Sequence, residues 1–140
     1  MKKYLILLLC LIIGAESYAQ KIKVACVGNS ITYGAGISNR DKDSYPAQLQ
    51  KLLGDEYEVR NFGVSGTTAL YNGITPYVQT SQYRESLEFN PDIVFIKFGT
   101  NDAGVRNNKF RPAFGEDYRK VVDTYRNLPS KPRVILLTPI

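Results

Sequence analysis

Four short apolar runs along the chain have the length and composition of buried β-strands. They lie at residues 21–27, 57–62, 93–98 and 133–138. The run at 93–98 is the clearest, because β-branched and aromatic side chains fill it except at Lys97. A near-continuous apolar run is typical of a strand covered on both faces of its sheet. We therefore predict one strand from each run.

Segments with helical spacing of apolar residues lie between these runs, at residues 44–54, 80–89 and 115–128. Pro46 near the start of the first segment and Gly54 at its end are typical helix boundaries. Strands that alternate with helices of this length favour an α/β fold built from βαβ units. Right-handed crossovers then give a parallel sheet with helices on both faces.

The first 19 residues have the pattern of a secretory signal peptide. Two lysines precede an apolar run at residues 4–13, and Ala19 ends a small-x-small site. The run is shorter than the roughly 20 apolar residues that a membrane-spanning helix needs. Lipid attachment at Cys10 is a weaker alternative, because Leu9 stands where such a signal needs a small residue. We expect cleavage after Ala19, a secreted or periplasmic protein, and one domain over residues 20–140.

Composition argues against several other functions. The formal net charge is +5, but the basic residues are scattered singly, which is typical of a solvated surface and argues against nucleic-acid binding. The chain contains no histidine and no cluster with metal-ligand spacing, so we expect no metal site. After cleavage Cys26 is the one remaining cysteine, and we expect it to be a buried, inert thiol without a disulfide.

Residues suited to acyl transfer follow three of the predicted strands. Ser30, Gly63 and Asn101 each lie just past a strand, and ligand sites in parallel α/β sheets form at the carboxyl ends of strands. We therefore expect the three to meet at one edge of the sheet. Ser30 would attack a carbonyl carbon, while its own N–H, the Gly63 N–H and the Asn101 amide would donate to the developing oxyanion. Four tyrosines could line a pocket there, although Tyr45 is better explained by packing on a helix face; the other three are Tyr33, Tyr71 and Tyr77.

These residues lie in segments that resemble the first three sequence blocks of the SGNH (GDSL-like) hydrolases in order, spacing and strand context. The segments are Gly28-Asn29-Ser30-Ile31-Thr32, Asn61-Phe62-Gly63-Val64-Ser65-Gly66 and Gly99-Thr100-Asn101-Asp102. The resemblance covers residues 22–140. It implies a flavodoxin-like three-layer α/β/α sandwich and a secreted bacterial serine esterase, similar to sugar or sialate O-acetylesterases, that uses no cofactor. The substrate would be a small-molecule or glycan acyl ester, with acetylated carbohydrate favoured.

The resemblance also implies a role for each matching residue. Ser30 would be the nucleophile, and Gly63 and Asn101 would be oxyanion-hole donors. Asn29 and Asp102 would be supporting residues. Asn29 stands where the family usually has aspartate, a replacement also found in many bacterial members that resemble sugar O-acetylesterases.

The family's catalytic Asp and His lie in an Asp-x-x-His block after a fifth strand, and this chain has no histidine. A serine hydroxyl is a poor nucleophile until a base takes its proton. We therefore expect a C-terminally truncated esterase domain, with four of five strands and without the catalytic Asp and His. Such a chain would show little or no turnover.

Two other functions are left open. A non-catalytic binding module would hold an acylated glycan or peptide at the same edge of the sheet. A flavin or nucleotide binder is less favoured, because Gly34-Ala35-Gly36 lacks the third glycine of a dinucleotide loop. Ser65 does not fit the spacing of a nucleophile elbow. The acyl group, the leaving group and the oligomeric state are not determined by the sequence.

Overall fold

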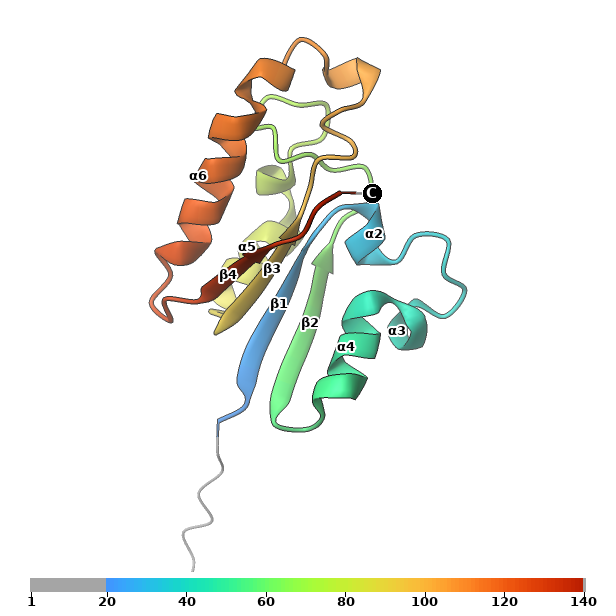
Figure 1. Ribbon diagram of the computed structural model, residues 1–140, viewed down its shortest axis with the longest axis vertical. Coiled ribbons are helices and arrows are strands. Elements are labelled where there is room, and N and C mark those ends of the chain that lie inside the picture. Colours follow the sequence, from blue (N-terminus) through green and yellow to red (C-terminus); the bar gives the residue numbers. More distant parts are fainter. Residues whose placement is uncertain (1–19, 140) are drawn as a thin grey trace, which may run out of the picture.

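The computed structural model describes residues 20–139, and the predicted signal peptide lies outside them. The strands form one four-stranded parallel sheet in the order β2-β1-β3-β4 (Figure 1). Their bounds are β1 Ile22–Gly28, β2 Tyr57–Gly63, β3 Ile93–Lys97 and β4 Arg133–Leu136. This order is that of a flavodoxin-like sheet, so the predicted α/β fold is confirmed.

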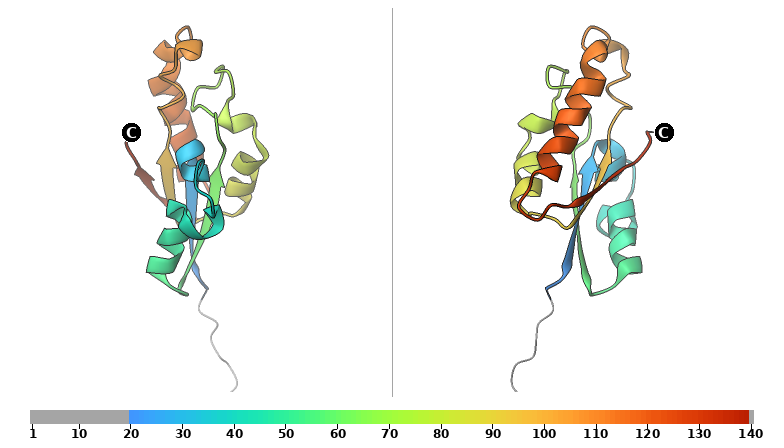
Figure 2. Two further views of the ribbon diagram at one scale, coloured as in Figure 1. Left: turned by 90° about the vertical axis from the view of Figure 1, so that its right-hand side faces the viewer. Right: turned by 60° about the vertical axis from the view of Figure 1, so that its left-hand side comes forward.

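Helices cover both faces of the sheet. The α-helices are α2 Ser30–Tyr33, α3 Arg40–Asp43, α4 Tyr45–Leu53, α5 Ser81–Glu88 and α6 Phe114–Arg126, and single 3-10 turns are η1 Tyr77–Gln79, η2 Val105–Asn107 and η3 Arg111–Ala113. Helix α4 lies on one face, and α5 and α6 lie on the other, which gives three layers (Figure 2). The three longest helices agree closely with the predicted segments. Within residues 20–139, no helix is long and apolar enough to cross a membrane.

The main core lies between the sheet and the layer formed by α5 and α6. Val94 and Ile96 of β3 are fully buried in one cluster with Val121 and Tyr125 of α6. Burying a side chain of this size contributes roughly 1.5–3 kcal/mol. The Tyr125 hydroxyl lies 2.6 Å from the Ser86 hydroxyl, which ties α6 to α5. This packing fixes the carboxyl ends of the strands from which the candidate site is built.

The face of the sheet on the α4 side is less completely covered. An apolar depression of about 610 Å³ lies there, and its lining includes Phe95 of β3, Leu49 of α4 and Leu137. Strand β4 is at the edge of the sheet, and Leu136 is 51% exposed. The apolar pattern of residues 133–138 is typical of a covered strand, but with four of five strands present we expect it to lie uncovered at the edge of the sheet. Among the described residues, β4 is such an edge strand with a partly open face.

The burial of Cys26 gives a direct test of the sheet. Burial raises the pKa of this β1 thiol to about 12, so it carries almost no thiolate at neutral pH. We expect iodoacetamide to leave Cys26 unmodified in the folded chain and to alkylate it fully in denaturant, with the site located by peptide mass spectrometry. Alkylation in the folded chain at the rate of a free cysteine would contradict the burial of β1.

Candidate active site

Ser30 begins helix α2 immediately after β1 ends. Strand β1 ends at Gly28, and the buried Asn29 caps the helix by accepting a hydrogen bond from the Ile31 N–H at 3.3 Å. The helix ends at Gly34, which has a φ of 90° and therefore the left-handed backbone that glycine tolerates best. A capped single turn thus holds the half-buried Ser30 at the carboxyl end of the central strand.

Gly63 is the last residue of β2 and lies against the backbone of α2. It pairs in register with Gly28, so the two strands end at the same level. A Cβ at Gly63 would lie 2.2 Å from the Tyr33 nitrogen and 2.6 Å from the Thr32 carbonyl carbon. Only glycine fits so close an approach of strand and helix. The structure therefore brings Gly63 and the helix that carries Ser30 together, as expected from the topology.

The Gly63 N–H already has a hydrogen-bond partner. It donates to Asn61 Oδ1 at 2.9 Å, and Asn61 Nδ2 in turn donates to the Tyr33 carbonyl at 3.4 Å. A substrate oxygen at Gly63 would have to share or replace the bond to Asn61. The sequence does not indicate this bond, because Asn61 is recognisable only as part of a family motif.

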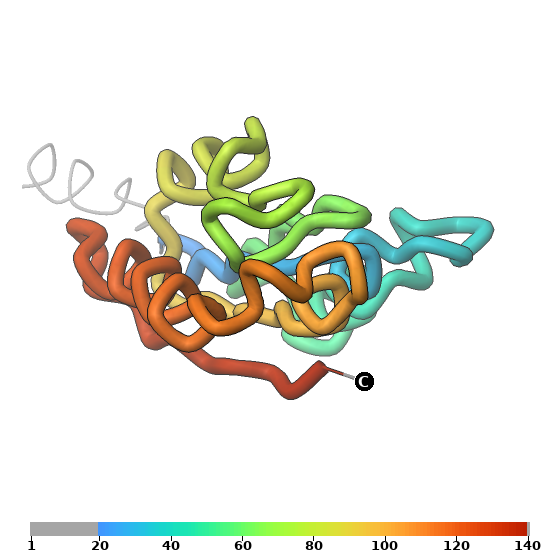
Figure 3. Tube along the Cα trace, turned by 90° about the horizontal axis from the view of Figure 1, so that it is seen from above, coloured from blue at the N-terminus to red at the C-terminus, as the bar shows by residue number. Residues whose placement is uncertain are grey.

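Asn101 lies just after β3, in the segment Gly99–Asp102, and connects this segment to the loop after β2. Its Nδ2 donates to the Thr67 carbonyl at 2.8 Å. Because a side-chain amide carries two N–H bonds, the second one is left for another acceptor. Figure 3 shows the loop after β2 and the loop after β3 side by side at this end of the molecule. Asn101 therefore lies at the same edge of the sheet as Gly63.

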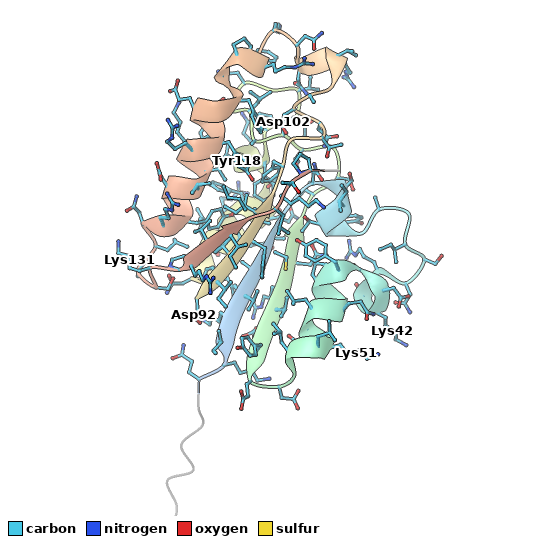
Figure 4. All side chains as sticks on the ribbon, in the orientation of Figure 1. Lys42, Lys51, Asp92, Asp102, Tyr118 and Lys131 are labelled. Carbon is cyan, nitrogen blue, oxygen red and sulfur yellow. The ribbon has the colours of Figure 1, made fainter. Side chains whose placement is uncertain are left out.

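Asp102 holds these two loops together. It is 2% exposed. One carboxylate oxygen accepts from the Ala69 and Leu70 N–H groups at 2.8 and 3.1 Å, and the other accepts from the Gly99 N–H at 3.0 Å. Burial raises the pKa of Asp102, whereas these N–H donors act in the opposite direction. Figure 4 shows Asp102 at the loop end of the sheet. Its contacts are those of a supporting residue.

Asn107 contacts the segment that contains Asn101, and sequence reasoning missed this residue. It is buried, its Oδ1 accepts from the Ile74 N–H at 2.9 Å, and its Nδ2 donates to the Asn101 carbonyl at 2.9 Å. The bond to Asn101 fixes the backbone of an expected oxyanion donor. A single asparagine in a polar loop gives no pattern from which this role could be predicted.

The usual base for a serine nucleophile is histidine. The chain contains no histidine. The two buried carboxylates, Asp102 and Asp117, accept hydrogen bonds from backbone N–H groups of the loop after β2. Within the same residues, no group of three His, Cys, Asp or Glu side chains could hold a metal ion. Among the described residues, the site therefore has candidate groups for attack and charge stabilisation and has no histidine for proton transfer.

A cavity of about 450 Å³ opens beside the segment Gly99–Asp102. Its lining includes Phe98 and Gly99, Phe114 and Tyr118 of the α6 layer, and Pro139, so its character is mainly apolar and aromatic. Such a cavity can take a small apolar group but has few polar atoms with which to orient it.

Replacing Gly63 tests the contact between β2 and α2. Gly63→Ala would drive a methyl group into the Tyr33 backbone, which cannot move aside, so we expect a loss in the free energy of unfolding of about 1–3 kcal/mol or more. Gly115→Ala is the control, because a Cβ there meets no atom within 4 Å and alanine favours the helix. Equal stability of the two variants in urea unfolding would contradict the close approach.

Replacing Asp102 tests the link between the loops. In Asp102→Asn, an NH2 group replaces an acceptor that faces backbone N–H groups, so we expect a loss in unfolding free energy of roughly 1–3 kcal/mol. Asp123→Asn is the matched control, because Asp123 is half exposed and forms only a 3.7 Å ion pair with Arg126. A loss no larger than that of the control would show that the buried carboxylate is not needed.

Comparisons with known proteins identify the family of the chain. The model of the GDSL-like lipase/acylhydrolase family matches residues 26–140. An acetylxylan esterase from Xylanibacter ruminicola is 41% identical in an alignment of 136 positions that covers 85% of this chain. The same alignment covers 28% of that esterase, so the chain spans less than a third of the relative's length.

Two solved structures share the fold. A two-domain esterase active on acetylated mannans has a TM-score of 0.60 and 24% identity, covering 91% of this chain and 33% of that chain. A carbohydrate acetylesterase family member from Sinorhizobium meliloti has a TM-score of 0.62 and 23% identity, covering 84% of this chain and 62% of that chain. The family match includes the segments that contain Ser30, Gly63 and Asn101, and on this basis the chain belongs to the GDSL-like lipase/acylhydrolase family.

Proposed function

We propose that this chain carries the nucleophile and the oxyanion hole of a serine ester hydrolase that removes acetyl groups from carbohydrate. The proposal rests on the contact between α2 and Gly63, which sets the helix of Ser30 against the end of β2. A substrate oxygen that reaches the Gly63 N–H would replace its bond to Asn61 Oδ1. The amide of Asn101 at the same edge adds a second donor. The names of the relatives, an acetylxylan esterase and an esterase active on acetylated mannans, support acetylated polysaccharide as the substrate.

The proposed reaction proceeds through an acyl-enzyme. The Ser30 hydroxyl oxygen bonds to the acetyl carbon while its proton passes to a base, and the carbonyl oxygen becomes an oxyanion. The N–H groups of Ser30 and Gly63 and the Asn101 amide stabilise that charge, each donor contributing roughly 3–4 kcal/mol in the transition state. The sugar oxygen then leaves with the proton. Water hydrolyses the acetyl ester on Ser30, which releases acetate and restores the hydroxyl.

The base in this proposal comes from outside these 140 residues, because none of them is a histidine. Loss of the triad histidine typically reduces the rate by about 10⁴ to 10⁶. A second copy of the chain does not supply the group, since it has the same sequence. The isolated chain is therefore expected to bind esters but to turn them over extremely slowly.

Export of the protein is also part of the proposal. It is supported by the two lysines and the apolar run at residues 4–13, which match a secretory signal peptide. Removal of acetyl groups from a polysaccharide outside the cell is consistent with such a signal.

The lack of histidine favours a second candidate function, a non-catalytic binding module. In that case the same edge of the sheet would hold an acetylated glycan through the donors near Gly63 and Asn101, without attack by Ser30. The two candidates differ in whether Ser30 can form a covalent bond.

Acetylation of Ser30 with an added base separates them. We would incubate the chain with p-nitrophenyl acetate and imidazole and locate acetyl groups by peptide mass spectrometry. We expect acetyl-Ser30, reduced acetylation in Asn101→Ala, and an unchanged level in Ser65→Ala, which alters an exposed serine of the loop after β2. Without imidazole, we expect no turnover above that of Ser30→Ala.

Acetyl groups on surface lysines with none on Ser30 would contradict the role of nucleophile and favour the binding module. Turnover that depends on Ser30 without imidazole would contradict the need for an external base.

A further inference from the structure

Helix α2 presents a second residue beside Ser30. Residues three apart in a helix lie on the same face, so Tyr33 is on the side of α2 that carries Ser30. Tyr33 is 39% exposed, whereas Thr32 between them is fully buried. The backbone of Tyr33 is fixed by its contact with Gly63. An aromatic residue on a rigid turn therefore lies three positions along α2 from the proposed nucleophile.

Arg40 packs against this ring. Its guanidinium carbon lies 4.2 Å from the centroid of Tyr33, which is a cation–π contact. The stem of Arg40 crosses Gly34, where a Cβ would lie 2.8 Å from Arg40 Cγ, so the glycine makes room for it. The ion pair with Asp41 is long, 3.7 Å, and Asp41 is 90% exposed, so it competes weakly for the guanidinium. N–H donors of Arg40 are left for a ligand.

This pair has the chemistry that recognises a sugar ring. The face of an aromatic ring is electronegative, and the C–H groups on one face of a pyranose are apolar and slightly electropositive. Stacking of a pyranose on the face of Tyr33 opposite Arg40 would use that complementarity, and guanidinium N–H groups at the edge of the ring could donate to sugar hydroxyls. A free acetate or an alkyl ester would not use both groups.

We propose that Tyr33 and Arg40 form a carbohydrate-binding platform, which holds the acetylated pyranose of a neutral polysaccharide beside Ser30. This inference rests on the proposed function for the identity of the substrate. Because binding can be measured without turnover, the platform can be tested in this 140-residue chain, which has no histidine.

To test the platform, we would titrate the chain with acetylated xylo-oligosaccharide and with acetylated manno-oligosaccharide and measure the binding affinity by calorimetry or NMR. Relative to the unsubstituted chain, we expect Tyr33→Ala to weaken binding about fivefold or more and Tyr33→Phe to change it less than about twofold, because phenylalanine keeps the aromatic face. We expect Arg40→Gln to weaken binding about threefold, because the cation–π contact and the charged donors are lost.

Two matched controls separate the platform from general effects on the fold. Arg60→Gln removes an equivalent cation–π contact, since Arg60 lies 4.4 Å from the Phe89 ring centroid. Tyr57→Ala removes a partly buried tyrosine at the first residue of β2, the opposite end of the strand from Gly63. Both controls should bind oligosaccharide like the unsubstituted chain, and circular dichroism would confirm that every variant is folded.

Unchanged affinity in Tyr33→Ala and Arg40→Gln would overturn the platform and leave the esterase proposal standing. Failure of the unsubstituted chain to bind either oligosaccharide would also overturn it. The esterase proposal fails separately, when imidazole and p-nitrophenyl acetate give no acetyl-Ser30.

Discussion

The close approach of β2 to the first turn after β1 is the constraint on which the site depends. Gly28 and Gly63 are register partners at the ends of parallel strands, and the Val64 N–H continues the ladder by donating to the Gly28 carbonyl at 3.0 Å. The turn that carries Ser30 is thus set directly on the end of β2. Groups positioned by a strand ladder are held more rigidly than groups on a free loop, which suits a nucleophile next to a backbone donor.

The other half of the site depends on polar contacts instead of apolar packing. Asn101 is held by bonds of its side chain and carbonyl to Thr67 and Asn107, and Asp102 ties the same segment to the loop after β2. A buried carboxylate loses hydration, and here backbone N–H groups replace the lost water. Each loop supplies donors or acceptors that the other lacks. Neither loop would keep this conformation alone, because its buried polar groups would be left without partners.

The sequence predicted what apolar periodicity encodes and missed what depends on loop contacts. Buried strands such as β3 and helices such as α6 are long enough to show a period. Because the carboxyl ends of parallel strands lie at one edge of the sheet, the sequence also predicts correctly that these strand ends lie together. Helix α2 was missed because four residues show no period, although it carries Ser30. The bonds of Asn61 to Gly63 and of Asn107 to Asn101 depend on how the loops fold, so no local pattern indicates them. The family resemblance identified candidate residues without their partners.

Charge stabilisation and proton transfer are separable tasks, and the described residues have groups suited to only the first. An oxyanion hole acts through dipoles that are fixed before the substrate arrives, so it needs geometry and no titrating group. Proton transfer needs a base whose pKa lies near the working pH, whereas both oxygens of the buried carboxylate Asp102 accept hydrogen bonds from backbone N–H groups. A site with the first property alone can bind an ester carbonyl and the sugar that carries it. The two proposed functions, carbohydrate binding and ester hydrolysis at this edge, would therefore use the same geometry and would differ by a single base near the Ser30 hydroxyl.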